Sequence, residues 1–160
     1  MVKRYWLFKS EPDTFSISDL ERVQTTSWDG VRNYQARNYL RDQVSTGDQV
    51  LFYHSNADPP AIVGIAEVIK VGYPDDSAFD RKSQYFDEKS NLQNPIWFVV
   101  DIKYLKTFTQ PIGLAELRAN PKLKNMVLLQ KGSRLSVQPV SADEWQLIMS
   151  MRHSLTKAVD

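Results

Sequence analysis

The chain of 160 residues contains no cysteine and only two histidines. Without cysteine, disulfide bonds, thiolate metal sites and cysteine nucleophiles are excluded, and the composition suits a reducing cytoplasm. His153 stands in the C-terminal tail, which leaves His54 at the end of a predicted strand. One histidine cannot build the usual zinc ligand set without carboxylate partners at regular spacing, so neither a metal nor another cofactor is expected.

Long apolar runs, clustered glycines and a strong net charge are also missing. No apolar run approaches the ~20 residues that span a bilayer, so no membrane partner is expected. Six glycines are scattered singly, which leaves no glycine-rich phosphate loop, and no G-x-S-x-G motif marks a serine nucleophile. A formal charge of +1 is too small for a protein that binds long nucleic acid through phosphates alone. If the protein contacts nucleic acid, it must therefore use a local group of charges or bind a base.

Strands outweigh helices in the middle of the chain, and the two do not alternate as regular βαβ units. Apolar and β-branched runs predict strands at residues 4–10, 49–55, 62–73, 96–108 and 134–140. Apolar periodicity predicts helices at residues 16–24, 33–43, 112–120 and 141–152. Gly64 inside a strand indicates a bulge or a close backbone approach, and residues 74–94 are expected to form a polar surface excursion with one helical turn. The pattern favours a small curved sheet or partly closed barrel with peripheral helices.

Capping signals mark the expected helix starts. Ser18 followed by Glu21, and Ser141 followed by Glu144, match the capping-box pattern, in which a hydroxyl and a carboxylate satisfy backbone N–H groups reciprocally. Asn33 fits the N-cap position of the helix over residues 33–43.

The stretch SWDGVRNYQARNYLR, residues 27–41, combines one Trp, two Tyr, two Asn and three Arg with few aliphatic residues. Flat rings beside amides suit a flat ligand such as a nucleobase, for which each stack on an aromatic side chain contributes ~1–3 kcal/mol. The candidate ring walls are Trp28, Tyr34 and Trp97. The candidate hydrogen-bonding groups are Ser10, Asn33, His54 and Ser55. The charges that could meet a phosphate are Lys9, Arg37 and Arg134. The remaining tryptophans, assigned to the core, are Trp6 and Trp145.

Each candidate also has a structural interpretation. For Trp28, which lies in a loop, core packing and ligand binding are equally open, whereas a strand Trp such as Trp97 more often packs in a core. Asn33 most simply caps a helix, His54 fits a satisfied structural histidine, and the arginines could form surface salt bridges. The binding interpretation depends on the clustering of these residues at strand ends and loops.

Several long segments then carry a family resemblance: YWLFKSEP, SWDGVRNYQARNYLR, GDQVLFYHSN, PIWFVVDI and LKNMVLLQKGSRLSVQPV. Together they resemble the EVE domain family, a group that includes stand-alone bacterial proteins and the thymocyte nuclear protein family. The resemblance covers about residues 5–149. The phrases GVRNYQARN and FYHSN are long and unusual in composition, so this match is far more specific than a lone glycine motif.

The resemblance implies a PUA-like fold of the α+β class, with a small mixed β-barrel of about five strands and short peripheral helices. Residues 1–151 would form a single EVE domain related to YTH and ASCH domains, and residues 152–160 a frayed C-terminal tail. EVE domains are regarded as readers of modified cytosine in DNA or of modified bases in RNA, and often accompany restriction-like systems. The implied partners are therefore a nucleic acid carrying a modified base and, functionally, a restriction-type nuclease. The implied location is cytoplasmic in a bacterium and nuclear in a eukaryote.

Similarity to YTH domains implies a site. Those domains hold a methylated base between Trp walls, beside a Lys-Ser pair on the first strand and a nearby Asn. In this sequence the pair would be Lys9 and Ser10, the walls Trp28 and Trp97, and the amide Asn33. The further lining residues that we expect are Tyr34, Arg37, His54, Ser55, Arg134 and Ser136.

The function expected from the sequence is thus non-catalytic reading of a modified nucleobase in an aromatic pocket. Two alternatives stay open. One is a nucleic-acid-associated hydrolase that uses His54, and the other is a protein-interaction module with a filled barrel and no ligand pocket. The sequence leaves open which base is read, whether the nucleic acid is DNA or RNA, and what the oligomeric state is.

Overall fold

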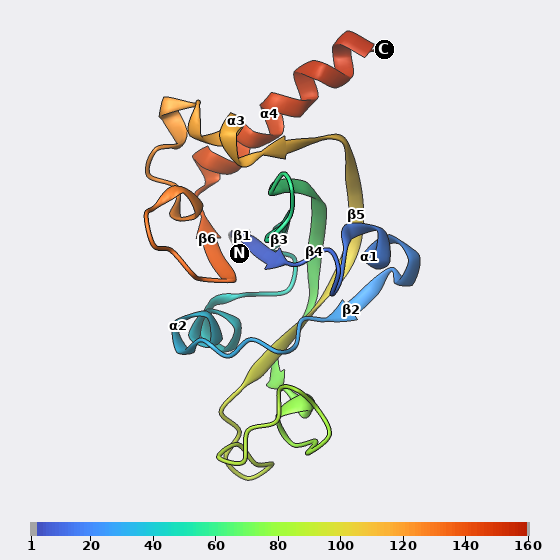
Figure 1. Ribbon diagram of the computed structural model, residues 1–160, viewed down its shortest axis with the longest axis vertical. Helices are drawn as coiled ribbons and strands as arrows, with labels where there is room; N and C mark the ends of the chain where they lie inside the picture. Colours follow the sequence, from blue (N-terminus) through green and yellow to red (C-terminus); the bar gives the residue numbers. More distant parts are fainter. Residues whose placement is uncertain (1–2, 160) are drawn as a thin grey trace.

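The computed structural model describes residues 3–159, with side chains described for residues 3–152. One mixed sheet of six strands runs through the molecule in the order β2-β5-β4-β3-β1-β6 (Figure 1). The strands are β1 (Tyr5–Ser10), β2 (Thr25–Ser27), β3 (Gln49–His54), β4 (Ala61–Pro74), β5 (Phe98–Gly113) and β6 (Val137–Val140). The α-helices are α1 (Ile17–Val23), α2 (Tyr34–Asn38), α3 (Leu114–Arg118) and α4 (Ala142–Val159). Single turns of other helix types are η1 (Tyr39–Gln43), η2 (Asp76–Ala78), η3 (Pro121–Leu123) and η4 (Val127–Leu129).

The predicted α+β class is confirmed, but the detail of a closed barrel of about five strands is not. The sheet has six strands and stays open between β2 and β6. Closure was expected because it protects strand edges. Here the edges are protected by their shortness instead, since β2 has three residues and β6 has four, one of them Pro139. Pairing is antiparallel throughout except between β1 and β3, which run parallel.

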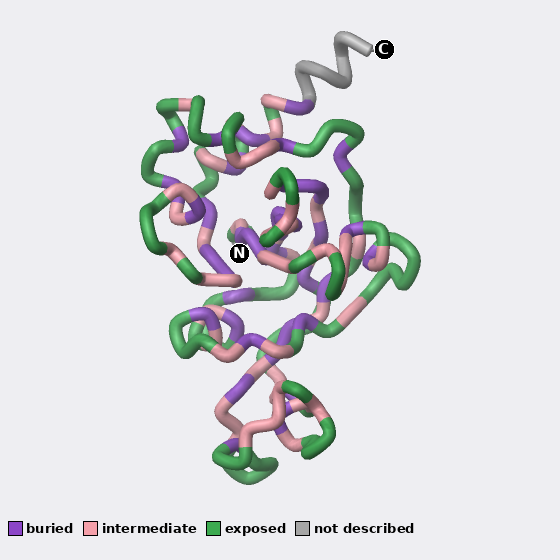
Figure 2. Tube along the Cα trace, viewed as in Figure 1, coloured by how far each residue is buried: buried purple, intermediate pink, exposed green. Residues whose placement is uncertain are grey.

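Both faces of the sheet are buried, as the strand periodicity requires. In β1, Trp6 and Phe8 pack into one core cluster and Leu7 into another on the opposite face. The first cluster includes residues of α1 and α2, and the second includes Trp145 of α4. The central strands accordingly form the purple interior of Figure 2. The prediction that Trp6 and Trp145 belong to the core is confirmed, since they are 1% and 5% exposed.

The long strands β4 and β5 form a hairpin that bends at several bulges. A Cβ on Gly64 would lie 2.3 Å from the backbone oxygen of Lys106, so the predicted close backbone approach at this glycine is confirmed. The register of the pair shifts between Ile62 and Gly64. Beyond the hairpin, residues 75–97 form a long excursion with one 3₁₀ turn, as predicted, and Figure 1 shows it projecting from the end of β4 and β5 opposite α4. We call it the β4–β5 loop.

The helix starts follow capping chemistry, with one correction. Helix α1 is capped by Ser16 and Asp19, not by Ser18 and Glu21, because Ser16 has the extended backbone of an N-cap whereas Ser18 already lies inside the helix. The second predicted box is confirmed: Ser141 Oγ accepts from the Glu144 N–H, and the Glu144 carboxylate accepts from the Ser141 N–H.

The C-terminal segment of α4 leads away from the sheet. The predicted frayed tail at residues 152–160 lies for the most part outside the residues whose side chains are described. Within the described part of the chain, no helix is both long and apolar enough to cross a membrane.

Candidate functional site

A pocket of about 670 Å³ opens where five parts of the chain meet. One side is built by the end of β1 with the loop after it, by Ser55 after β3 and by the loop that precedes β6. The opposite side is built by the segment between β2 and α2 and by the β4–β5 loop. Its lining comprises Lys9, Ser10, Glu11, Thr14, Phe15, Thr26, Ser27, Trp28, Asp29, Gly30, Val31, Arg32, Asn33, Ser55, Gln84, Tyr85, Arg134 and Ser136.

Trp28 belongs both to this pocket and to the core. Its indole is 8% exposed, packs edge-on against Phe52 at 5.5 Å between ring centroids, and lies tilted on Phe8 at 5.3 Å. Its backbone N–H donates to Val100 O at 2.8 Å, which fixes the residue against β5. Both interpretations of Trp28 therefore hold: most of the ring is packed, and what remains open faces the pocket.

A second aromatic ring in the pocket comes from Tyr85 in the β4–β5 loop. This ring lies directly over Gly30, because a Cβ on Gly30 would be only 2.6 Å from its Cζ atom. Gly30 also has a φ of +78°, which side chains other than glycine rarely adopt. The Asp29-Gly30 turn thus lets Tyr85 rest on the backbone of the β2–α2 segment.

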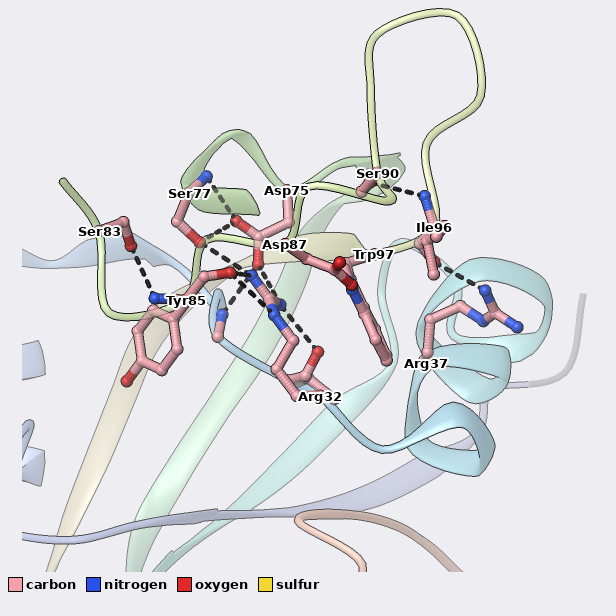
Figure 3. Close-up of polar contacts among 12 residues, drawn as sticks. Arg32, Arg37, Asp75, Ser77, Ser83, Tyr85, Asp87, Ser90, Ile96 and Trp97 are labelled. Carbon is pink, nitrogen blue, oxygen red and sulfur yellow. Dashed lines mark hydrogen bonds and ion pairs between the residues drawn. The ribbon is translucent and has the colours of Figure 1, made fainter. Parts of the chain in front are cut away.

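Arg32 fastens the β4–β5 loop to the β2–α2 segment (Figure 3). Its Nε and Nη2 both donate to Tyr85 O, at 3.1 and 2.6 Å, and its Nη1 donates to Asp75 Oδ2 at 3.1 Å. The guanidinium also lies 5.5 Å from the ring centroid of Tyr85 and 5.2 Å from that of Trp97. A planar fork with several donors is needed for this set of contacts, which a lysine could not reproduce.

Asp75 is the buried acceptor at the centre of this network, with 1% exposure. Its carboxylate accepts from the hydroxyl of Ser77 at 2.6 Å, from the Gly30 N–H at 2.9 Å and from Arg32. Burial acts to raise the pKa of Asp75, but these hydrogen bonds outweigh it and the pKa is lowered. The carboxylate therefore stays ionised and ties the pocket loop to η2.

Trp97 lies outside the pocket lining, so the structure does not bring the two predicted Trp walls together. Its ring is 4% exposed, and its indole N–H donates to Asp87 Oδ2 at 2.7 Å. One face is covered by Tyr34, whose ring centroid lies 4.9 Å away, and Arg32 lies over the ring as well. Trp97 is thus a packed anchor of the β4–β5 loop, held by Asp87 of this loop, by Tyr34 of α2 and by Arg32 of the β2–α2 segment.

Tyr34 and Arg37 likewise lie beside the pocket rather than in its lining. Tyr34 is 57% exposed, and Arg37 lies over its ring at 5.0 Å. Arg37 also donates to Ile96 O at 2.7 Å, which holds the end of the β4–β5 loop against α2 (Figure 3). Their predicted ligand contacts are not supported by the pocket, although the exposed Tyr34 ring remains open on the neighbouring surface.

The opposite side of the pocket is tied together by backbone hydrogen bonds. The Lys9 N–H donates to Ser136 O at 2.8 Å, and the Ser55 N–H donates to Ser10 O at 3.0 Å. The Ser10 hydroxyl donates to Phe15 O at 2.6 Å, which leaves its oxygen able to accept. These contacts bring the predicted residues Lys9, Ser10, Ser55 and Ser136 to one wall.

His54 is adjacent to this wall but does not line the pocket. Its Nε2 accepts a hydrogen bond from the Ile17 N–H at 3.1 Å, at the start of α1. Burial lowers its pKa, which favours the neutral ring that can accept this bond. The structural interpretation of His54 fits these contacts.

Two cationic side chains at the pocket have no ion-pair partner among the described residues. Lys9 is half-buried and forms no ion pair with any of the described residues, and burial lowers its pKa. Arg134 is exposed and likewise has no hydrogen bond or ion pair within the described part of the chain. Keeping an ammonium partly out of water without a partner costs free energy, which suggests that Lys9 is kept for a negatively charged ligand.

Seven of the eleven predicted site residues line the pocket: Lys9, Ser10, Trp28, Asn33, Ser55, Arg134 and Ser136. The prediction that Asn33 caps a helix is also confirmed, since its Oδ1 accepts from the Ala36 N–H at 2.9 Å. Sequence reasoning missed Tyr85, Arg32 and Asp29. Arg32 and Asp29 stand inside the unusual SWDGVRN segment and could have been included, whereas nothing local distinguishes Tyr85 within a polar loop.

Comparison with known proteins decides the family. A family model described as EVE domain matches residues 4–151. The chain belongs to the EVE domain family. This EVE domain is 40% identical over 169 residues to human thymocyte nuclear protein 1, an alignment that covers 94% of this chain and 74% of the human protein.

Solved structures support the same relationship. A protein from Pseudomonas syringae, 48% identical, matches this EVE domain with a TM-score of 0.89 over 92% of this chain and 99% of that one. The human THYN1 protein in complex with DNA containing 5-methylcytosine, 38% identical, matches with a TM-score of 0.88 over 94% and 98%. An ASCH protein from Zymomonas mobilis, 10% identical, covers 92% and 94% with a TM-score of 0.52, which shows similarity of fold alone.

Proposed function

We propose that this EVE domain is a non-catalytic reader of 5-methylcytosine in DNA, and that the base enters the pocket between Trp28 and Tyr85. The observation that carries the proposal is a pocket whose aromatic rings include Trp28 and Tyr85, together with two cations that have no partner among the described residues, in a domain whose human relative was solved with DNA containing 5-methylcytosine. RNA is the less favoured ligand, because that relative's ligand is DNA.

The size and lining of the pocket suit one base. A volume of about 670 Å³ exceeds what a single pyrimidine needs and leaves room for its sugar. Stacking on an aromatic ring contributes ~1–3 kcal/mol per base, and Tyr85 offers such a ring on a loop held by Arg32. Taking a base out of a duplex costs a few kcal/mol because its pairing and stacking are lost. The contacts in the pocket must therefore contribute at least that much binding free energy.

The two cations suit the phosphates on either side of such a base. Lys9 and Arg134 both line the pocket, and neither has a partner among the described residues. Few phosphate contacts are needed when the base supplies the rest of the affinity, which fits the formal charge of +1.

Reading without chemistry is supported by the position of His54. This side chain lies outside the pocket lining and already accepts a hydrogen bond from Ile17. The predicted functional association with a restriction-type nuclease stays a prediction.

The test is fluorescence anisotropy with a labelled duplex that contains one 5-methylcytosine, compared with the same duplex containing cytosine. We expect the wild-type protein to prefer the methylated duplex by about fourfold or more, since burial of one methyl group contributes ~0.8 kcal/mol. Tyr85→Ala should weaken binding to the methylated duplex by about tenfold, whereas Tyr85→Phe keeps the ring and most of the affinity.

Three outcomes would contradict parts of the proposal. Equal affinity for both duplexes would remove 5-methylcytosine as the ligand, and tighter binding to an RNA of the same sequence and modification would remove DNA. Unchanged affinity in Tyr85→Ala would exclude this ring from the site. Tyr85 donates no side-chain hydrogen bond in the described structure, and its carbonyl contact with Arg32 is retained in both variants.

A further inference from the structure

The pocket contains a carboxylate that the proposed stacking and phosphate contacts do not use. Asp29 lines the pocket directly after Trp28, and its side chain has no hydrogen bond or ion pair to any other residue in the described part of the chain. Partial burial and the neighbouring negative charge of Asp75 raise its pKa. Such a group is costly to keep in a site meant for DNA, where phosphates would repel it.

Several other polar side chains of the lining already have partners. The carboxylate of Glu11 accepts from Asn56 Nδ2 at 3.1 Å, and Asn33 Oδ1 accepts from the Ala36 N–H. Ser10 donates to Phe15 O. Among the carboxylates of the lining, Asp29 is therefore the one whose side chain has no hydrogen bond or ion pair with another described residue.

The proposed ligand has a close analogue that poses a recognition problem. 5-Methylcytosine and thymine carry the same methyl group at position 5, so neither the rings nor a methyl-sized space can separate them. They differ at the edge: cytosine has an amino donor at position 4, whereas thymine has a carbonyl acceptor there. A carboxylate facing position 4 accepts from the amino group and repels the carbonyl.

Building on the proposed function, we infer that Asp29 is the specificity-determining residue that selects a 4-amino pyrimidine and rejects thymine. Its place fits this role, because Asp29 follows Trp28 in the same loop and lines the same pocket. The backbone of that loop is held by hydrogen bonds from Trp28 N–H to Val100 O and from Gly30 N–H to Asp75. The carboxylate is thus presented from a fixed backbone.

The test compares two duplexes, one with a 5-methylcytosine·G pair and one with a T·A pair at the same position, against wild-type protein and Asp29→Asn. The ratio of the two affinities is measured for each protein, and the ratio of these ratios is independent of the cost of opening either pair. Asparagine can donate to the thymine carbonyl. We expect the preference for 5-methylcytosine over thymine to fall about tenfold or more in Asp29→Asn.

Glu11→Gln is the matched control, since it removes one negative charge from the same pocket. It should raise the affinity for both duplexes to a similar extent and leave the preference unchanged. An unchanged preference in Asp29→Asn, or an equal loss of preference in Glu11→Gln, would overturn the inference.

Failure of the inference is distinguishable from failure of the proposed function. If wild type prefers the methylated duplex over the cytosine duplex but Asp29→Asn still rejects thymine, the reader stands and Asp29 is not its selector. If wild type has no preference for the methylated duplex, the proposed function fails first. Circular dichroism of each variant establishes that it is folded, which is expected because the Asp29 side chain makes no hydrogen bond to another described residue and its substitution is isosteric.

Discussion

At the scale of single residues, Trp28 shows how one side chain can serve the core and a pocket at once. The ring contacts Phe8 and Phe52 in the interior, and only its remaining edge and face reach the ligand space. Weaker binding on removing Trp28 would therefore say little about recognition, because the core is changed as well. Tyr85, held by its backbone, allows the cleaner test.

We expect Trp28→Ala to lower the free energy of unfolding by about 3–5 kcal/mol, the usual cost of removing a packed Trp. Urea unfolding followed by circular dichroism measures this loss, and Tyr85→Ala serves as the comparison, with a loss well below that of Trp28→Ala. A similar stability of Trp28→Ala and wild type would mean that the indole is held by the pocket alone, and that its packing against the core contributes little.

The predicted site residues show where sequence reasoning succeeds and where it fails. Lys9, Ser10 and Asn33 could be placed because each stands at the end of a strand or the start of a helix, where local patterns are informative. Trp97 could not be placed: whether a strand Trp faces a pocket or a filled space depends on what packs over it. Tyr34 covers it here, from a helix more than sixty residues earlier in the chain.

At the scale of elements, five of the six strands could be predicted because hydrophobic periodicity is local, whereas the three-residue strand β2 was missed because it is too short to show a period. The position of the β4–β5 loop could not be predicted either, since it depends on long-range contacts that Arg32 and Arg37 make with Tyr85 O and Ile96 O. Closure of the sheet was also beyond local patterns. The sheet ends at β2 and β6, which are not paired with each other, and the apolar alternation of single strands does not specify which strands pair.

The junction of α1 and β3 provides a pH test at this scale. His54 Nε2 accepts from the Ile17 N–H only when that nitrogen is unprotonated, and burial lowers the pKa of His54 in the folded protein below its ordinary value of 6.5. The unfolded chain therefore binds a proton more readily. The stability that His54 contributes is present above pH 6.5 and is lost as the pH falls below it, through the folded-state pKa.

We expect the free energy of unfolding of wild type to fall more between pH 7.5 and pH 5 than that of His54→Gln, whose side chain does not titrate but still offers an acceptor. Urea unfolding at the two pH values measures the difference, and carboxylate effects common to both proteins cancel. Equal losses in the two proteins would show that the hydrogen bond between His54 and Ile17 does not depend on protonation.

At the scale of the whole molecule, the balance of charge determines how binding should respond to salt. The formal charge of +1 provides no general attraction to DNA, so the electrostatic part of the proposed binding must come from a few cations near the pocket. Lys9 and Arg134 are the pocket cations that lack a partner in the described part of the chain. Removal of a cation that touches one phosphate should lower the slope of log affinity against log salt concentration by about 1.

We therefore expect a small salt slope for wild type, with Lys9→Ala and Arg134→Ala each lowering it by about 1 and weakening binding to methylated and unmethylated duplexes alike. Lys122→Ala is the matched control, because Lys122 is exposed in η3 and does not line the pocket. Anisotropy titrations over a range of salt concentrations measure the slopes. Equal reductions in all three variants would indicate diffuse attraction by the whole surface. A slope that changes only in Lys9→Ala and Arg134→Ala would place the phosphates at the mouth of the pocket, on either side of the proposed base.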